Sequence, residues 1–335
     1  MTRVFLSHPQ NRLAHYFGPR ASTALQAIAD VTFNPGDTDL SSAQLAALAQ
    51  DCDIIIAYRQ TVGDETLLSA LPRLQAFVRC AIDISTVDVA AASRHGVLVT
   101  QASAGFMASV SEWVVGVMID LGRNISAASE RYHAGQTAVP VMGSQLKGAT
   151  LGVIGYGQIG RYLCDIALAL GMRVVVHDPH TAVDRPGLVE ASLDQLLRQA
   201  DHVVCLAVAS AETERMMNAP AFSLMKRGAF FINASRGDLV DDEALLQALN
   251  SGHLAGCALD VGRAPDQMPS PRLAMHPRVI ATPHIGGLTP AAVEHQAMET
   301  VAQVADLIAG RAPQGAVNLT HASRWHRIHH APPTK

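Results

Sequence analysis

The sequence predicts an α/β protein of two domains, each a doubly wound parallel sheet, with a cleft between them. Three observations lead to this fold class. Short apolar segments alternate with amphipathic helices along most of the chain. The apolar segments are continuous runs, which is typical of parallel strands that are buried on both faces. The chain has 335 residues, which is long for one hydrophobic core and sufficient for two domains.

The composition is that of a globular protein without a surface for nucleic acid or membrane. Apolar residues make up 49% of the chain and charged residues 16%, and the net charge is −4. This charge gives no basic footprint for nucleic acid. The first residues are too short in apolar length for a signal peptide, and no apolar run reaches the roughly 18 residues that span a bilayer. We therefore expect a cytoplasmic protein.

The cysteines and the C-terminal histidines do not indicate a metal centre. The five cysteines are widely spaced and never occur as CxxC: Cys52, Cys80, Cys164, Cys205 and Cys257. We expect free, buried thiols in a reducing compartment, and neither disulfides nor a zinc site. Residues 321–335 show no periodicity and are expected to be disordered. Histidines in this tail can bind metal, but a solvated tail is the preferred interpretation: His326, His329 and His330.

The first predicted domain contains segments from both ends of the chain. Four apolar segments are expected to be its strands: residues 3–7, 53–58, 76–81 and 97–100. A capped helix is predicted at 40–50, and another helix at 290–310. If the chain crosses between the domains twice, the later helix packs on the first domain. This domain then comprises residues 1–102 and 286–320.

The second domain is predicted over residues 103–285. A long helix is expected at 109–135, where Ser109 and Glu112 match a capping box. Six strands follow, separated by helical connections: "ATLGVIG", "RVVVHD", "HVVCLAV", "AFFINA", "GCALDV" and "VIATP". This alternation is typical of a doubly wound sheet.

The segment "GVIGYGQIGRYL" has the spacing of a dinucleotide-binding loop. Gly155, Gly157 and Gly160 form G-x-G-x-x-G between a predicted strand and a helix. The first glycine permits a tight turn, the second lets the backbone approach a pyrophosphate, and the third lets helix and strand pack closely. The phosphates are expected on the amides around Gln158 and Ile159, at the helix N-terminus. The alternative interpretation is a glycine-rich turn without a ligand.

Asp178 ends the next predicted strand and indicates which dinucleotide binds. Its carboxylate is placed to accept hydrogen bonds from the ribose hydroxyls of the adenosine. The same charge would repel a 2′-phosphate, and the residues that follow, "PHTAVDRPG", offer no immediate Arg or Lys. The sequence therefore predicts NAD in preference to NADP.

Polar side chains follow three later strands of the second domain. They are Arg236, then Arg263 with Asp266, and finally His284. Ligands of open α/β sheets bind at the carboxyl ends of the strands. An arginine fork binds a carboxylate, a histidine passes protons near neutral pH, and an acid beside the histidine raises its pKa. Together these groups suit the reduction of a 2-keto acid by a hydride from the cofactor. Taken singly, Arg236 can equally be a surface charge and His284 a turn residue.

The sequence resembles the NAD-dependent D-isomer-specific 2-hydroxyacid dehydrogenase family. The motifs that carry the resemblance are "LKGATLGVIGYGQIG", "INASRGDLVDDEAL", "GCALDV" and "TPHIGG", in this order, and it extends to about Asn318. It implies two Rossmann-like domains, of which a flavodoxin-like substrate domain is built from both chain ends. It also implies a homodimer with the long helix after residue 109 in the interface.

The resemblance assigns roles to single residues. It places the carboxylate-binding arginine at Arg236 and the general acid/base histidine at His284, and it places Asp260 beside the nicotinamide ring. The expected cofactor-binding residues are Gly155, Gly157, Gln158, Ile159, Gly160, Asp178, Ala234 and Asp260.

The chain departs from the family pattern after "GCALDV". The family usually reads D-V-x-x-x-E-P there, and its Glu is the partner of the catalytic histidine. Pro265 stands at the Glu position and Asp266 follows it. The hypothesis is that a small loop shift lets Asp266 act as the partner of His284. The alternative is that Asp266 is a solvated loop acid.

A second departure concerns substrate binding in the first domain. The family commonly has a Gly-rich loop whose amides bind the substrate carboxylate. In "RCAIDISTVD" the glycine positions are Ala81 and Asp83, with Ile82 between them. Asp83 can bond a substrate hydroxyl or point away. Tyr58 and Arg59 are further candidates for the substrate's tail, and Arg59 suits an acidic group there.

These observations predict an NAD-dependent D-2-hydroxyacid dehydrogenase, in which Arg236 anchors a 2-keto or (R)-2-hydroxy acid and His284 transfers the proton. The sequence leaves open whether the substrate is of a phosphoglycerate, a glyoxylate/hydroxypyruvate or a sugar-acid type. The alternative is an NAD(H)-sensing regulatory protein on the same fold, with weak or no catalysis.

Overall fold

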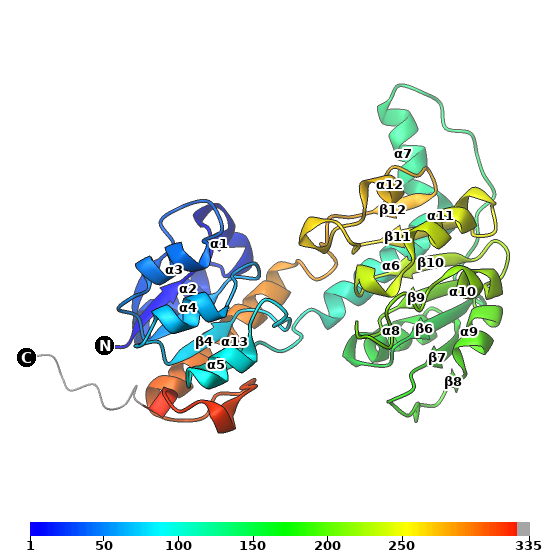
Figure 1. Ribbon diagram of the computed structural model, residues 1–335. Coiled ribbons are helices and arrows are strands. Elements are labelled where there is room, and N and C mark those ends of the chain that lie inside the picture. Colours follow the sequence, from blue (N-terminus) through cyan, green and yellow to red (C-terminus); the bar gives the residue numbers. More distant parts are fainter. Residues whose placement is uncertain (327–335) are drawn as a thin grey trace, which may run out of the picture. The chain divides into compact units, whose positions relative to one another are not determined.

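The computed structural model describes residues 1–326, apart from the side chain of Asp266. The chain forms two compact units, each built around a parallel sheet with helices packed against it (Figure 1). Unit 1 consists of Met1–Gly105 and the described residues from Pro290 onward, and unit 2 is Phe106–Thr289. The predicted fold class, two α/β units with doubly wound parallel sheets, is confirmed.

Unit 1 contains a five-stranded sheet in the order β2-β1-β3-β4-β5. Its strands are β1 (Arg3–Leu6), β2 (Asp30–Phe33), β3 (Ile54–Ala57), β4 (Ala76–Arg79) and β5 (Leu98–Gln101). This order is that of flavodoxin-like sheets. Strand β2 was not predicted, because this short edge strand is only half-buried and therefore lacks a continuous apolar run.

Six helices belong to unit 1. They are α1 (Gln10–Tyr16), α2 (Pro19–Ile28), α3 (Ser42–Leu48), α4 (Glu65–Ala70), α5 (Val89–Arg94) and α13 (Pro290–Ala309). The predicted cap of α3 is confirmed, since Ser41 and Gln44 form a capping box. The predicted return of the chain is confirmed as well, because α13 packs against α1, α2 and β4.

The segment after α13 is ordered further than the sequence suggested. Disorder was expected from residue 321, but Leu319–His321 forms a 3₁₀ turn and the side chains of Ala322 and Trp325 are buried. Both join the core cluster that α13 helps to form, and this burial holds the segment in place. His329 and His330, the other histidines considered as metal ligands, lie outside the described residues.

Unit 2 contains a seven-stranded sheet in the order β12-β11-β10-β9-β6-β7-β8. Its strands are β6 (Thr150–Ile154), β7 (Arg173–His177), β8 (Leu188–Glu190), β9 (His202–Cys205), β10 (Phe230–Asn233), β11 (Gly256–Leu259) and β12 (Val279–Ala281). The six predicted strands are present. The seventh, β8, is a short and exposed edge strand that leaves little apolar signal.

The helices of unit 2 lie on both sides of this sheet (Figure 1). They are α6 (Met107–Arg123), α7 (Ile125–His133), α8 (Gln158–Ala169), α9 (Leu193–Gln199), α10 (Ala219–Leu224), α11 (Asp242–Asn250) and α12 (Pro271–Ala274). Two 3₁₀ turns lie in the loops after β10 and β11: Gly237–Leu239 and Pro265–Gln267.

The predicted capping box at Ser109 is wrong. Helix α6 begins two residues earlier, at Met107, with Phe106 in the cap position, so Ser109 lies inside the helix. The Ser109 hydroxyl is instead 2.7 Å from that of Thr289. The predicted single helix is also divided, because Asn124 adopts a left-handed conformation with φ 54° between α6 and α7.

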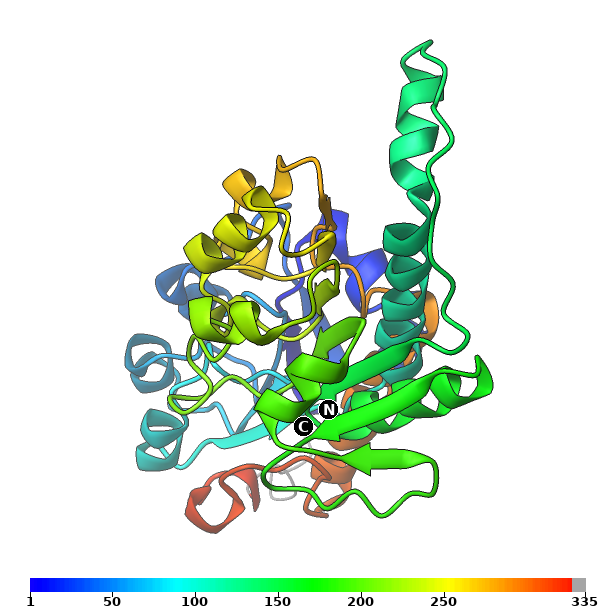
Figure 2. The same cartoon turned by 90° about the vertical axis from the view of Figure 1, so that its right-hand side faces the viewer.

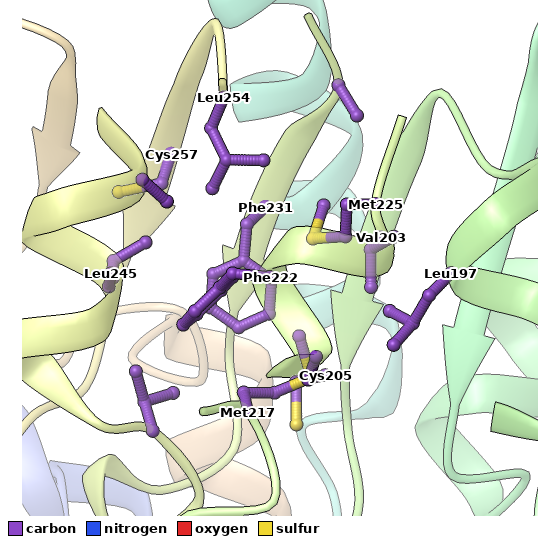
Figure 3. Close-up of a cluster of buried hydrophobic side chains, with 14 of the residues drawn as sticks. Leu197, Val203, Cys205, Met217, Phe222, Met225, Phe231, Leu245, Leu254 and Cys257 are labelled. Atoms are coloured by element: carbon purple, nitrogen blue, oxygen red, sulfur yellow. The ribbon is translucent and has the colours of Figure 1, made fainter. Parts of the chain in front are cut away.

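One large hydrophobic core of unit 2 lies between the sheet and helices α9, α10 and α11 (Figure 3). Phe231 of β10 meets Phe222 of α10 edge to face, with ring centroids 5.3 Å apart. Cys205 and Cys257 lie in the same cluster. All five cysteines of the chain are buried and unpaired, and burial raises the pKa of the Cys205 thiol to about 12. These thiols therefore behave as small apolar side chains. Within residues 1–326, no helix combines the length and the apolar character needed to span a bilayer.

Two buried histidines are expected to make the fold sensitive to acid. Burial lowers the pKa of His8 to about 3, assisted by the charge of Arg79, and burial lowers the pKa of His202 to about 4. Below the ordinary value of 6.5, the unfolded chain therefore binds protons that the folded chain does not. Each histidine then reduces the free energy of unfolding by up to about 1.4 kcal/mol per pH unit as the pH falls towards the folded pKa.

We expect His202→Gln to flatten this dependence in urea unfolding of the protein between pH 7 and 5. The variant removes the group that titrates in the unfolded state. The number of protons taken up when unit 2 unfolds, given by the pH dependence of its free energy of unfolding, should therefore fall by about one. An identical slope for the variant and the wild type would contradict the assignment.

Candidate active site

The predicted site residues of unit 2 all lie at one edge of its sheet. Gly155 follows β6, Asp178 follows β7, Arg236 follows β10, Asp260 follows β11 and His284 follows β12. The strands are parallel, so these positions share the carboxyl edge. The strand order changes direction at β6, with β7 on one side and β9 on the other. Such a switch point is where open α/β sheets bind their ligands.

The glycine loop has the geometry that its spacing predicts. Gly155 has φ +99°, and a Cβ atom there would lie 2.7 Å from the backbone N of Ala207. A Cβ on Gly160 would collide with the carbonyl oxygen of Gly155. Around Gly157, in contrast, no atom lies within 4 Å of the Cβ position. The first and third glycines are therefore required by the packing of the protein itself, and the second leaves open space.

Helix α8 presents its N-terminus to this open space. Gly157 is the N-cap, the helix begins at Gln158, and no side chain caps it. The amides at an uncapped N-terminus and the helix dipole favour an anion. The helix N-terminus at Gln158, Ile159 and Gly160 is therefore open to an anion, and a side chain on Gly157 would fill part of that space.

We expect alanine at the second and third glycines to have different effects. Gly157→Ala should leave the melting temperature unchanged but weaken NADH binding by about tenfold or more, because the new methyl group fills only the space for the phosphate. Gly160→Ala should lower the melting temperature and also weaken NADH binding, because its methyl group collides with the backbone of Gly155. Calorimetric melting and NADH fluorescence titration test this contrast. Equal effects of both substitutions on melting would contradict it.

Asp178 organises the end of β7. Its Oδ2 accepts a hydrogen bond from the Tyr156 N–H at 2.7 Å, and its Oδ1 accepts from the N–H groups of His180 and Thr181 at 2.8 and 3.0 Å. Burial alone would raise the pKa of Asp178, but these three donors together hold it below the ordinary value. The carboxylate is therefore charged at neutral pH and fixed beside the glycine loop.

The turn that carries Arg236 is held by buried polar contacts. The side-chain amide of Asn233, the last residue of β10, donates to the Arg236 carbonyl at 2.9 Å and accepts from the Ser235 N–H at 3.1 Å. The Ser235 hydroxyl donates to the carbonyl of Ala207 after β9. A Cβ on Gly237 would collide with the backbone of Gly262 after β11. The turn is therefore fixed between the loops that follow the neighbouring strands.

The loop that carries His284 is held by Asp260. This carboxylate is 3% exposed and accepts three hydrogen bonds. Its Oδ1 receives the Thr282 hydroxyl at 2.6 Å and the Ile285 N–H at 2.8 Å, and its Oδ2 receives the Gly286 N–H at 2.7 Å. His284 itself has φ 55°, which non-glycine residues rarely adopt, and its N–H donates to the Asp260 carbonyl at 3.0 Å. Asp260 thus stabilises a strained backbone at the proposed catalytic residue.

Arg263 is engaged by neighbouring loops. Its guanidinium donates to Glu214 at 2.8 Å and to the Asp238 carbonyl at 2.9 Å, and Nη1 lies 3.4 Å from the Asp238 carboxylate. The hydrogen bond with Glu214 is the main reason that the pKa of Arg263 is raised. Arg263 therefore links the loops after β9 and β10. The side chain of Asp266 lies outside the described part of the chain, although its backbone forms part of the 3₁₀ turn Pro265–Gln267.

The candidate residues of unit 1 lie at the carboxyl ends of β3 and β4. The Arg59 guanidinium lies 5.8 Å from the centre of the Tyr16 ring, and the buried Tyr58 hydroxyl receives a hydrogen bond from Arg12. Asp83 turns one carboxylate oxygen to its own loop, where it accepts the Ser85 N–H at 2.8 Å. This geometry resembles an Asx turn, which shapes the loop locally.

Several residues that shape the candidate site carry no local sequence signal, because their contacts join distant segments. Asn233 shapes the turn of Arg236, and Tyr16 of α1 contacts Arg59. Arg79, a charge within an apolar strand, donates to three backbone carbonyls. A charged residue inside the run "AFVRCA" was the one signal that could have drawn attention to it, because buried charges are rare.

The fold and the glycine loop are those of a dinucleotide-binding α/β protein. Residues 115–286 match the family model of the D-isomer specific 2-hydroxyacid dehydrogenase, NAD binding domain. D-3-phosphoglycerate dehydrogenase 3 of Arabidopsis thaliana, a chloroplastic protein, is 34% identical over 285 residues, covering 84% of this chain and 48% of that protein. The chain spans about half the length of the curated relatives that it matches first.

Solved structures show the same fold over nearly the whole chain. D-lactate dehydrogenase from Aquifex aeolicus, complexed with NAD and lactic acid, is 27% identical, with a TM-score of 0.76 and coverage of 96% of this chain and 97% of that one. The TT0316 protein of Thermus thermophilus is 28% identical, with a TM-score of 0.83 and coverage of 94% and 100%. The chain therefore belongs to the D-isomer specific 2-hydroxyacid dehydrogenase family, as its motifs predicted, and unit 2 contains its NAD-binding domain.

Proposed function

We propose that the protein is an NAD-dependent D-2-hydroxyacid dehydrogenase that interconverts a 2-keto acid and its (R)-2-hydroxy acid. The observation that carries the proposal is that Arg236 and His284 lie at the same edge of one sheet. Each follows a strand at the carboxyl edge of the NAD-binding sheet, and each lies on a loop that a buried polar residue fixes. A regulatory protein that only senses NAD(H) would not need both side chains.

In the proposed reaction, Arg236 binds the substrate and His284 transfers the proton. The Arg236 guanidinium binds the substrate carboxylate with parallel hydrogen bonds and draws electron density from the keto group. A bound NADH would supply the hydride for the carbonyl carbon and would itself be oxidised to NAD⁺. The imidazolium of His284 donates its proton to the carbonyl oxygen, which becomes the hydroxyl, and His284 takes the proton back in the reverse direction.

Unit 1 carries further candidate substrate-binding groups. We assign to this role Arg59 and the loop residues Ala81, Ile82 and Asp83. Among the described residues, no acceptor receives the N–H groups of Ala81 and Ile82. Two such amides suit a carboxylate, and Arg59 suits an acidic group at the other end of the substrate.

Asp266 is proposed as the partner of His284 in place of the glutamate that Pro265 displaces. An acid beside the imidazole favours its charged form, so the Asp266→Asn substitution should lower the pKa of the proton donor. The pH–rate profile of keto-acid reduction should then shift to lower pH, and Asp266→Glu should restore it. A profile of Asp266→Asn that matches the wild type would refute this role.

NAD is proposed as the preferred cofactor because the Asp178 carboxylate is charged and fixed where an adenosine ribose would bind. We expect Asp178→Ser to raise the ratio of kcat/KM for NADPH over NADH by about tenfold, which corresponds to about 1.4 kcal/mol. The measurement is steady-state kinetics with both cofactors. An unchanged ratio would show that Asp178 does not select the cofactor.

A panel of 2-keto acids tests the activity directly. The panel comprises glyoxylate, hydroxypyruvate, phosphohydroxypyruvate, pyruvate, phenylpyruvate and longer sugar-derived keto acids, each followed by the absorbance of NADH. Rapid turnover of one compound would support the dehydrogenase and identify the substrate type. Tight NADH binding without any turnover would favour the NAD(H)-sensing alternative.

A homodimer in the cytoplasm is part of the same proposal. Helix α7 and the segment after it extend away from the sheet of unit 2 (Figure 2). No residue of α7 is buried. Large apolar side chains are exposed along this arm: Ile125, Tyr132, Val139, Val141 and Met142. Exposed apolar patches mark interfaces, and a second copy of the chain is the proposed occupant. Sedimentation velocity of the wild type and of Met142→Asp tests it, and a monomeric wild type would contradict it.

A further inference from the structure

Arg79 is a buried cation that joins two strand ends of unit 1. It is the last residue of β4 and is 1% exposed. Its guanidinium donates to the carbonyls of Tyr58 and Arg59 at the end of β3. Its Nε donates to the carbonyl of Asp83, in the loop after β4, at 2.9 Å. One side chain therefore connects the two segments that carry the proposed substrate-binding residues.

Burying the charged guanidinium of Arg79 costs free energy. Burial lowers its pKa to about 10, so the guanidinium remains positive at neutral pH. Three backbone carbonyls accept hydrogen bonds from the guanidinium, and the negative charge of Asp83 also favours its positive form. Filling this position with an apolar side chain would avoid that cost. A planar fork with donors on three nitrogens is suited to fixing two segments at once, which an ammonium group cannot do equally well.

The loop after β4 has few features of its own that would fix its backbone, so the contact with Arg79 matters for its shape. It contains no glycine between Cys80 and Ser85, and neither Ala81 nor Asp83 has a positive φ. Two side-chain contacts help to hold its shape, namely the hydrogen bond from Arg79 to the Asp83 carbonyl and the hydrogen bond from the Ser85 N–H to the Asp83 carboxylate.

We propose that Arg79 is a positioning residue for substrate binding. It orders the segment at Tyr58–Arg59 and the loop at residues 81–83, so that the Arg59 side chain and the backbone amides of the loop meet the substrate in fixed positions. The inference rests on the proposed function. Arg79 itself is buried, so we assign it a role that acts through these two segments.

The test compares Arg79→Lys with Arg73→Lys, a matched substitution just before β4. Arg73 is half-exposed and pairs with Asp53. We expect Arg79→Lys to raise the KM for the keto acid by about tenfold or more, with kcat and the NADH dissociation constant changed by less than about threefold. Hydrogen exchange of the amides at 58–62 and 80–86 should be faster in Arg79→Lys alone. Arg73→Lys should match the wild type in all four measurements.

The outcomes separate this inference from the proposed function. An unchanged KM in folded Arg79→Lys, or a loss of NADH binding equal to the rise in KM, would overturn the positioning role. Faster exchange throughout unit 1 would assign Arg79 to general stability and also overturn it. If the wild type reduces no keto acid, the proposed function fails. Faster exchange confined to the two segments would still support Arg79 as their connection, and unchanged exchange would refute it.

Discussion

Replacing His284 with asparagine is expected to lower kcat for keto-acid reduction by about a thousandfold, while NADH binds as tightly as to the wild type. A positioned general acid contributes about 10²–10⁴ in rate, and asparagine cannot supply a proton at neutral pH. Asparagine is the appropriate replacement because it tolerates a positive φ better than most residues, and His284 has φ 55°. The backbone of the loop should therefore survive the substitution.

The control for this substitution is His276→Asn. His276 lies just before β12, and its ring is 3.3 Å from the side chain of Asn250. The proposed mechanism does not use this histidine, which precedes the same strand that His284 follows, so kcat should stay within about twofold of the wild type. Single-turnover measurement of NADH oxidation separates the chemical step from product release. A His284→Asn enzyme within tenfold of the wild-type rate would show that another group donates the proton.

The geometry of the glycine loop could be predicted from the sequence because its constraints are local. The spacing of Gly155, Gly157 and Gly160 is set by one turn and one helix start, and all three occupy the predicted geometry. The continuous apolar strands were equally clear. Strands β2 and β8 were not predicted. Short edge strands that are half-exposed or exposed have too few buried side chains to produce a continuous apolar run.

The rest of the site depends on contacts between residues far apart in the chain, which spacing cannot reveal. The capping box at Ser109 failed for this reason. The start of α6 lies beside another segment, because a Cβ on Gly287 would be 3.2 Å from the Cβ of Phe106. Arg79 is a similar case, since its three acceptors lie on two separate loops. The resemblance places Asp260 beside the nicotinamide ring, which stays a prediction; its spacing gave no sign that its carboxylate holds a loop that begins 22 residues later.

The substitution Asp260→Asn is expected to damage catalysis through the His284 loop. An amide has one oxygen, so its NH₂ group must face at least one of the three donors that the carboxylate now accepts. Leaving a buried donor unsatisfied and losing the charged acceptor should reduce the free energy of unfolding by about 2–4 kcal/mol. With the loop relaxed from its strained backbone, His284 should be displaced, and a displacement of about 1 Å can reduce kcat by about a hundredfold.

Asp201→Asn provides the matched control, because Asp201 is also a carboxylate of this sheet that accepts a backbone N–H, from Thr150 at 2.8 Å. It lies at the start of β9, at the sheet edge opposite the proposed site, so its loss should lower stability and leave kcat intact. If Asp260→Asn and Asp201→Asn affect kcat alike, the loss follows from stability alone. If Asp260→Asn raises the dissociation constant of NADH and leaves kcat unchanged, the carboxylate acts on the cofactor, as the family resemblance suggested. A fall in kcat with NADH affinity retained is the result that the three hydrogen bonds predict, because their donors lie on the loop that carries His284, the proposed proton donor.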